Sequence, residues 1–173
     1  MVLIPPDVQT MRFEGYGPQG AVVLIECLTA DPGRTREQLR RVFRAHEGFL
    51  AAEGAVSYLF DRVGWLRFAP GTDRAPLAEV AYAAGAEDVA GTSLEGLEVR
   101  TDPEEFEAIR RALARRGWVP VAAGVSERAT LTVPLAGAAA CRWRELLQAL
   151  AEVDGVRHVY SNVEISDALL AGV

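Results

Sequence analysis

Residues 11–28 read Met-Arg-Phe-Glu-Gly-Tyr-Gly-Pro-Gln-Gly-Ala-Val-Val-Leu-Ile-Glu-Cys-Leu and predict two strands separated by a glycine-rich turn. The second strand, Ala21 to Leu28, is an apolar run rich in β-branched residues, which is typical of a central strand. The glycines and the proline of Gly15 to Gly20 predict the turn. Because a strand and not a helix follows this turn, we interpret it as a hairpin connection rather than a phosphate-binding loop.

The residues after the hairpin predict one helix and two more strands. A helix is expected over residues 32–45, because an aspartate cap and a first-turn proline stand at its start. Two apolar runs, at residues 56–61 and 65–69, predict strands joined by a tight turn near Val63–Gly64. The remainder of the chain repeats a pattern of helix, glycine and strand. Helices are expected at residues 76–84, 103–116 and 138–153, and strands at residues 97–100, 119–125, 130–135 and 156–160.

This order predicts an α+β fold with two ferredoxin-like α/β sandwich domains, the smaller inserted into the larger. The outer domain is expected to comprise residues 1–72 and 128–173, and the inserted domain residues 73–127. On the last helix, the spacing of Trp143, Leu147 and Leu150 places these side chains on one buried stripe.

The composition and charge of the chain argue against several classes of function. The chain has 173 residues, a formal charge of −6 and 18 basic residues, all of them arginine. The acidic excess argues against nucleic-acid binding over the whole surface. Cys27 and Cys141, with only His46 and His158, have no metal-ligand spacing, so we expect no metal and no cofactor. The sequence shows neither a signal peptide nor an apolar run long enough for a membrane, so we expect a cytoplasmic protein.

One predicted helix concentrates positive charge. Residues 32–45 hold five arginines and one glutamate, so this segment carries +4 and the rest of the chain −10. On a helical wheel the arginines lie opposite the apolar residues. Two interpretations stay open: a stripe that binds RNA, DNA or an anionic ligand, or a solvated surface. The candidate binding residues are Arg36, Arg40, Arg41 and Arg44.

Five residues are candidates for chemistry: His46, Glu53, Glu14, Tyr16 and Glu127. His46 falls at the end of the arginine-rich helix, where a histidine serves as a helix-end cation, a packed residue or a base oriented by nearby acids. Glu14 and Tyr16 flank the glycine-rich turn and offer polar groups to a cleft. We leave the catalytic assignment open.

Several sequence segments, taken together, resemble those of the YebC/PmpR family. The similar segments are Phe13–Pro18 (FEGYGP), Glu26–Leu28 (ECL), Arg34-Thr35 before a helix that includes Phe43, Gly54–Phe60 (GAVSYLF), Ala84–Val89 (AGAEDV) and Val159–Asp167 (VYSNVEISD). Their order and spacing hold from about residue 11 to residue 167. The resemblance implies two α+β domains, the second inserted into the first, and a role as a regulator of transcription or translation.

The chain also departs from the family pattern at three places. Family members begin with a basic helical domain, and the resemblance here is preceded only by residues 1–10. Relatives carry Gly-Gly-Asn-Leu-Gly where this chain reads Glu47-Gly48-Phe49-Leu50-Ala51, and Met-Ile-Pro where it reads Glu127-Arg128-Ala129. We expect both internal departures to lie between the two domains.

Two functional hypotheses follow. The first is a regulator or adaptor that lacks the helical domain and contacts RNA, the ribosome, DNA or a protein partner, with weakened nucleic-acid binding. The second is a YebC-like scaffold recruited as a small-molecule enzyme, a hydrolase or cyclase in secondary-metabolite biosynthesis for example, with its site in the interdomain cleft near the five candidate residues. Neither hypothesis involves a membrane, and both leave oligomerisation open.

Overall fold

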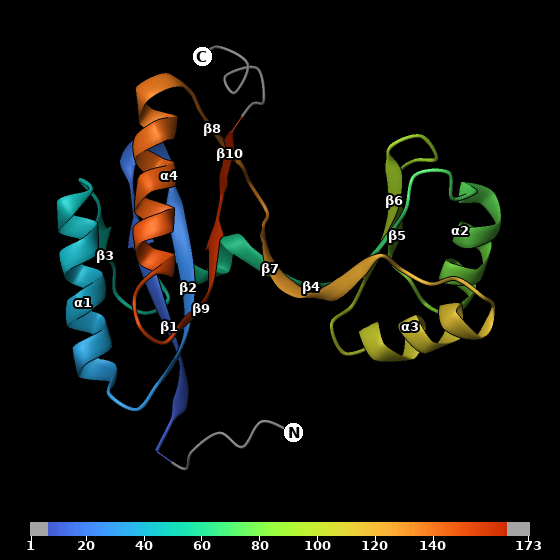
Figure 1. The fold of residues 1–173 in the computed structure, drawn as a ribbon, viewed down its shortest axis with the longest axis horizontal. Coiled ribbons are helices and arrows are strands. Elements are labelled where there is room, and N and C mark those ends of the chain that lie inside the picture. The colour runs from blue at the N-terminus through green and yellow to red at the C-terminus, as the bar shows by residue number, and fades with distance from the viewer. Residues whose placement is uncertain (1–6, 166–173) are drawn as a thin grey trace. The chain divides into compact units, whose positions relative to one another are not determined.

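The computed structural model describes residues 7–165, so Ser166 and Asp167 of the last family-like segment lie outside the described residues. The chain divides into two compact units. The first unit contains the chain up to Phe60 and again from Ala129 onward, and the second contains Asp61–Arg128. In Figure 1 the blue-to-teal start and the deep orange-to-red end of the chain accordingly belong to one unit, and the green-to-golden middle belongs to the other.

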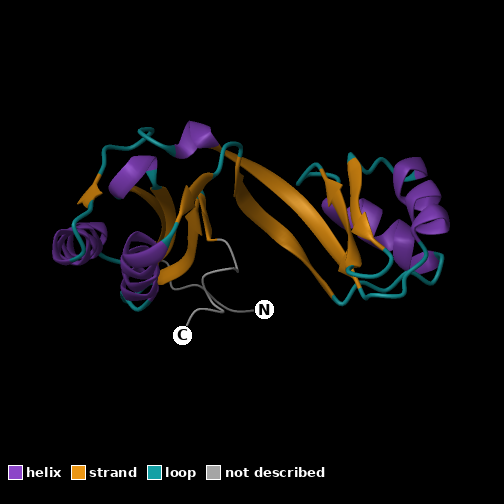
Figure 2. Cartoon of the chain, turned by 90° about the horizontal axis from the view of Figure 1, so that it is seen from above, coloured by secondary structure: helices purple, strands orange, loops and turns teal. Residues whose placement is uncertain are grey.

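The first unit is a four-stranded sheet, in the order β3-β1-β2-β9, with two helices on one face. Figure 2 shows these helices nearly end-on, beside one another, on one side of the strands. Two short strands, β8 and β10, form a separate parallel pair, and β10 follows β9 directly in the chain. The elements are β1 (Gln9–Tyr16), β2 (Val22–Thr29), α1 (Pro32–Ala45), β3 (Phe49–Leu50), β8 (Val133–Leu135), α4 (Gly137–Ala151), β9 (Val156–Ser161) and β10 (Val163–Ile165), with short 3-10 turns at Pro18–Gly20 and Ser57–Leu59.

Two aromatic rings attach the helices to the first sheet. Phe43 of α1 and Trp143 of α4 are both almost completely buried. A Cβ atom on Gly15 would lie 2.1 Å from Cζ of Phe43, and one on Gly17 would lie 2.0 Å from Cζ3 of Trp143. The glycines predicted to form a turn therefore serve mainly to admit these rings. The indole Nε1 of Trp143 also donates a hydrogen bond to Oγ of Ser161, at 3.0 Å.

The second unit has the strand–helix–strand–strand–helix–strand order of a ferredoxin-like domain. Its sheet has the order β5-β6-β4-β7, and α2 and α3 pack against the apolar face formed by residues such as Leu66, Val99 and Ile109. The first unit builds the same kind of sandwich with a different chain order. The elements are β4 (Phe60–Phe68), α2 (Arg74–Ala83), β5 (Asp88–Thr92), β6 (Gly96–Thr101), α3 (Phe106–Arg115) and β7 (Ala122–Ala129). The predicted α+β class with two domains is confirmed.

The predicted tight turn near Val63–Gly64 is wrong. Residues 60–68 form one continuous strand, β4, which pairs antiparallel with β6. Gly64 is buried inside this strand, and a Cβ there would lie 2.2 Å from Oγ1 of Thr101. Close packing, and not chain reversal, requires the glycine. The boundary between the two compact units falls within β4, at Phe60/Asp61, because Phe60 packs with Val22 and Leu24 of the first unit. The sequence places this boundary at residue 72/73.

Two other element boundaries differ from the predictions. The strand expected at residues 119–125 instead covers Ala122–Ala129, because Pro120 has no amide hydrogen for a ladder. The helix expected from Pro103 begins at Phe106, after a turn in which Oδ1 of Asp102 accepts a hydrogen bond from the Glu104 amide at 2.7 Å. The other helices and the hairpin lie within a few residues of their predicted positions.

We predict that Trp143→Ala lowers the free energy of unfolding by about 3–5 kcal/mol, because the loss of a fully buried ring leaves a cavity against Gly17. Urea denaturation followed by circular dichroism measures this change. Leu94→Ala is the control, since this side chain is 90% exposed and its removal should leave the midpoint unchanged. Equal midpoints for the two variants would mean that Trp143 does not hold α4 on the sheet.

The two cysteines should differ in reactivity. Burial raises the pKa of the Cys27 thiol to about 11, so almost no reactive thiolate forms there at pH 8, whereas Cys141 is exposed on α4. We expect iodoacetamide to modify one thiol per native chain and both thiols in urea, as counted by mass spectrometry. A Cys141→Ser variant should resist modification until it is unfolded. Modification of that native variant at the unfolded rate would contradict the burial of Cys27.

Candidate functional site

Helix α1 presents its arginines on the side away from the core. The side chain of Asp31 caps the helix by accepting a hydrogen bond from the Arg34 amide at 2.9 Å. Thr35, Leu39 and Phe43 form the buried side of the helix. The remaining surface carries the predicted binding residues, which we call the arginine face: Arg36, Arg40, Arg41 and Arg44.

The members of the arginine face have different local partners. The guanidinium of Arg36 lies over the ring of Phe13, 5.3 Å from its centroid. Glu37 pairs with Arg40 at 2.9 Å and approaches Arg41 at 3.8 Å. Arg44 occupies the last turn, where the helix dipole favours a cation, and forms no ion pair with any described residue.

These contacts leave the arginine face available to an anion. Arg36, Arg41 and Arg44 are exposed, and Arg40 is partly exposed. Ion pairs between exposed side chains contribute only about 0–1 kcal/mol, so Arg40 and Arg41 can exchange Glu37 for a phosphate at little cost. The structure therefore places the four residues on one accessible helix surface, as the spacing predicts.

Glu14 is buried and binds backbone amides of residues 54–57. Its side chain is buried, and its carboxylate accepts hydrogen bonds from the amides of Gly54 at 2.7 Å, Val56 at 2.5 Å and Ser57 at 2.9 Å. These bonds hold the segment that covers the face of the sheet opposite α1 and α4, where Val56 packs on Leu24 and its neighbours. The carboxylate is thus occupied by backbone donors.

Tyr16 supports the same segment. Its hydroxyl donates a hydrogen bond to the carbonyl of Ala55 at 3.2 Å, and its ring stacks on Phe49 with centroids 5.0 Å apart. Glu53 is exposed at the start of this segment. Three of the five candidate residues for chemistry, Glu14, Tyr16 and Glu53, therefore gather around residues 53–57, with two of them fixed by hydrogen bonds to the backbone.

The other two candidates lie elsewhere. His46 is the C-terminal cap residue of α1, is partly buried and donates its amide hydrogen to the Phe43 carbonyl at 3.1 Å. Glu127 is buried on β7, in the second unit. A catalytic role for the five residues stays a prediction.

At Glu47, where the family pattern has glycine, the backbone has a conformation that favours glycine. Glu47 has a φ of 59°, in the left-handed region, although it carries a side chain. Gly48 follows, and a Cβ there would lie 2.8 Å from the Tyr16 carbonyl oxygen. The Glu47 carboxylate reaches Arg142 of α4 at 3.6 Å, so the replaced glycine position now carries a surface ion pair.

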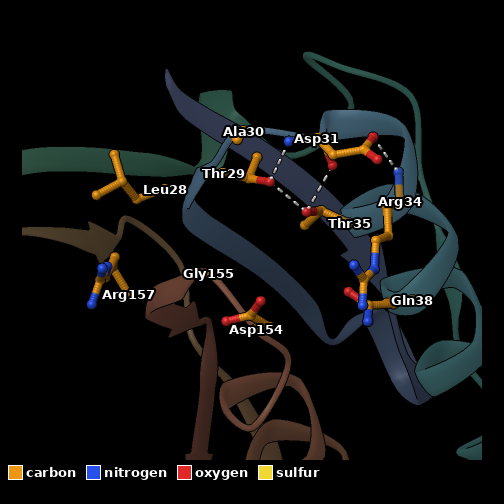
Figure 3. Close-up of a pocket in the computed structure, with 10 residues that line it drawn as sticks. All are labelled: Leu28, Thr29, Ala30, Asp31, Arg34, Thr35, Gln38, Asp154, Gly155 and Arg157. Atoms are coloured by element: carbon orange, nitrogen blue, oxygen red, sulfur yellow. Dashed lines mark hydrogen bonds between the residues drawn. The ribbon is translucent and has the colours of Figure 1, made fainter. Parts of the chain in front are cut away.

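A cavity of about 300 Å³, which no local sequence pattern predicts, adjoins the start of α1. Figure 3 shows its lining residues, which come from the end of β2, the first turns of α1, the loop between α4 and β9, and the start of β9. Two arginines, Arg34 and Arg157, line it together with Asp154 and Gln38. Only the fold brings Arg157 and Arg34 to opposite sides of one cavity, and no sequence pattern marks them.

Residues 7–165 contain neither a metal-ligand cluster nor a membrane-spanning helix. Within this range no group of three or more His, Cys, Asp and Glu side chains is placed to hold a metal ion. No helix in the same range combines the length and apolar character needed to cross a membrane.

We predict that Glu14→Gln lowers the free energy of unfolding by about 2–4 kcal/mol, because the amide group presents its own donors to buried backbone N–H groups. Glu53→Gln, at an exposed position, is the matched control and should change the stability by less than about 0.5 kcal/mol. Chemical denaturation of both variants checks this. Indistinguishable stabilities would show that Glu14 does not anchor the segment.

Known proteins resemble nearly the whole chain. The family profile described as TACO1/YebC second and third domain matches residues 8–163. A probable transcriptional regulatory protein of Halorhodospira halophila is 39% identical over 157 residues, which cover 91% of this chain and 64% of that protein. A protein of the same name from Nitrosococcus oceani is 36% identical over 163 residues, covering 94% and 66%. The chain thus spans about two thirds of the length of these relatives.

A solved structure agrees with the family match. The crystal structure of a conserved hypothetical protein, Aq1575, from Aquifex aeolicus superposes with a TM-score of 0.77 and 33% identity, covering 95% of this chain and 68% of that one. The resemblance inferred from the sequence motifs is therefore confirmed. The chain belongs to the TACO1/YebC family.

Proposed function

We propose that the chain is a regulatory module of the YebC type that acts in transcription or translation and contacts nucleic acid through the arginine face of α1. The relatives named as probable transcriptional regulatory proteins support the regulatory role. The observation that carries the proposal is the accessible set of Arg36, Arg40, Arg41 and Arg44 on one helix surface.

The charge distribution favours weak contact through α1. Residues 32–45 carry +4, while the rest of the chain carries −10 in sum, which lowers the overall attraction for a polyanion. Glu37 further competes with phosphates for Arg40 and Arg41. Binding is accordingly weak and independent of sequence at this surface, with a Kd no lower than about 10⁻⁵ M at physiological salt. Such a module acts as an adaptor, with a partner contributing further affinity.

The recruited-enzyme hypothesis has less support. Glu14 and Tyr16, which were expected to offer polar groups to a cleft, instead bind backbone groups of residues 54–57. We therefore advance the regulatory function alone.

Fluorescence anisotropy with labelled single-stranded RNA and duplex DNA tests the proposal at about 50 mM and about 200 mM salt. Four phosphate contacts on a single strand predict a slope of log K against log salt of about −3. The double variant Arg40→Gln/Arg44→Gln should reduce the magnitude of this slope by about 1.4, since each contact contributes about 0.7.

Arg115→Gln/Arg116→Gln is the matched control, because it removes two exposed arginines at the end of α3 in the second unit. Its slope should equal that of the unmodified chain. Equal reductions of the salt slope in the two double variants would show that binding depends on the total charge of the chain and not on the arginine face. Failure of the unmodified chain to bind at about 50 mM salt would refute the proposal.

A further inference from the structure

The cavity at the start of α1 has fixed walls within the first unit. The loop between α4 and β9 passes close to the end of β2, where the Leu28 amide donates a hydrogen bond to the Gly155 carbonyl at 2.7 Å. Gly155 has a φ of 86°, and a Cβ there would lie 2.7 Å from the Leu28 carbonyl oxygen. This close approach requires glycine and holds the loop as one wall of the cavity, facing α1 (Figure 3).

Arg157 is directed by a β-bulge. In the pairing of β2 with β9, Glu26 lies opposite His158 and Cys27 opposite Val156, so Arg157 is the extra residue. A bulge redirects the side chain that it carries, and bulges are frequent beside functional sites. Arg157 lines the cavity, and its guanidinium has no ion pair or hydrogen bond with the part of the chain that the structure describes.

Arg34 stands on the α1 wall of the same cavity. Its amide is bound by Oδ1 of Asp31, and the Thr35 amide by the Asp31 carbonyl at 3.1 Å. The amides of Arg34 and Thr35 are therefore satisfied inside the protein, and the guanidinium is the group that Arg34 offers to a ligand. Like Arg157, it forms no ion pair within residues 7–165.

The remaining polar groups indicate more than a phosphate. The cavity of about 300 Å³ also exposes the Asp154 carboxylate and the Gln38 amide. A carboxylate repels a phosphate but accepts a hydrogen bond from the exocyclic amino group of a base, as Asp and Glu do with N4 of cytosine. Figure 3 shows the two guanidinium groups on opposite sides of the cavity with the carboxylate between them. This arrangement matches a short single strand, with phosphates on the arginines and a base on the acid.

The cavity also continues the arginine face. Arg34 precedes Arg41 by two helical turns and lies on the same side of α1. A strand that lies along this face can place its next nucleotide in the cavity. We propose that this cavity is a nucleotide subsite for single-stranded nucleic acid, in which Arg34 and Arg157 each bind a phosphate of the strand and Asp154 selects a base with an amino group. This inference rests on the function proposed above.

The phosphate contact is tested with short labelled oligocytidine and the variant Arg157→Gln. At about 50 mM salt, the loss of one contact should weaken binding about 5- to 10-fold and reduce the salt slope by about 0.7. Arg144→Gln, which removes an exposed arginine of α4 outside the cavity, is the matched control and should weaken binding less than about twofold. Arg34→Gln repeats the test from the opposite wall, should Arg157→Gln fail to fold by circular dichroism.

Base selection is tested by comparing oligocytidine with oligouridine, which lacks the amino group. The unmodified chain should bind oligocytidine about three- to tenfold more tightly, as expected for one charge-assisted hydrogen bond at a partly solvated site. Asp154→Ala should abolish this preference, because it removes the acceptor, and should not weaken the binding of oligouridine, because it also removes a negative charge.

Two results would overturn the inference. If Arg157→Gln and Arg34→Gln bind like Arg144→Gln, and the unmodified chain shows no preference for oligocytidine, the cavity is not a nucleotide subsite. The proposed function would still stand in that case, provided that Arg40→Gln/Arg44→Gln weakens binding. If the unmodified chain binds neither oligonucleotide at about 50 mM salt, the inference and the proposed function both fail.

Discussion

The packing of two aromatic rings on two glycines is the constraint on which the first unit depends. Phe43 and Trp143 occupy the space that side chains at Gly15 and Gly17 would fill. Because each ring belongs to a different helix, this contact fixes α1 and α4 on the same face of the sheet. The orientation of α1 then follows, with its apolar side buried and its arginines outward. The surface charge of the proposed binding face is therefore a consequence of how the core packs.

The opposite face of that sheet is organised by a buried carboxylate. Glu14 accepts hydrogen bonds from three backbone N–H groups of residues 54–57, and the Val56 group among them is buried and would otherwise need another partner. The segment that Glu14 holds leads directly into β4, the first strand of the second unit. One charged side chain thus defines the route by which the chain leaves the first unit. These hydrogen bonds explain why β1, which pairs with the apolar strand β2, contains a buried glutamate.

Sequence patterns predict where the helices and strands lie better than they predict the structural role of individual residues. The hairpin, the helix α1 and the buried stripe containing Trp143 follow from periodicity, and the structure confirms them. Gly64 was interpreted as a turn, because a glycine between two apolar runs gives the same pattern whether the chain reverses or a neighbouring side chain needs room. Burial of Glu14 depends on distant amides, and the position of Arg157 depends on a register shift between two strands. Neither is encoded in local spacing.

The most direct measurement of the central claim is a titration of the ¹⁵N-labelled chain with a short oligocytidine, followed by amide chemical shifts. The account predicts progressive shifts on the exposed side of α1 and in the loop around Gly155, together with unchanged amides in α3. Shifts confined to the second unit, or spread evenly over both units, would contradict the assignment of the arginine face as the surface that contacts nucleic acid.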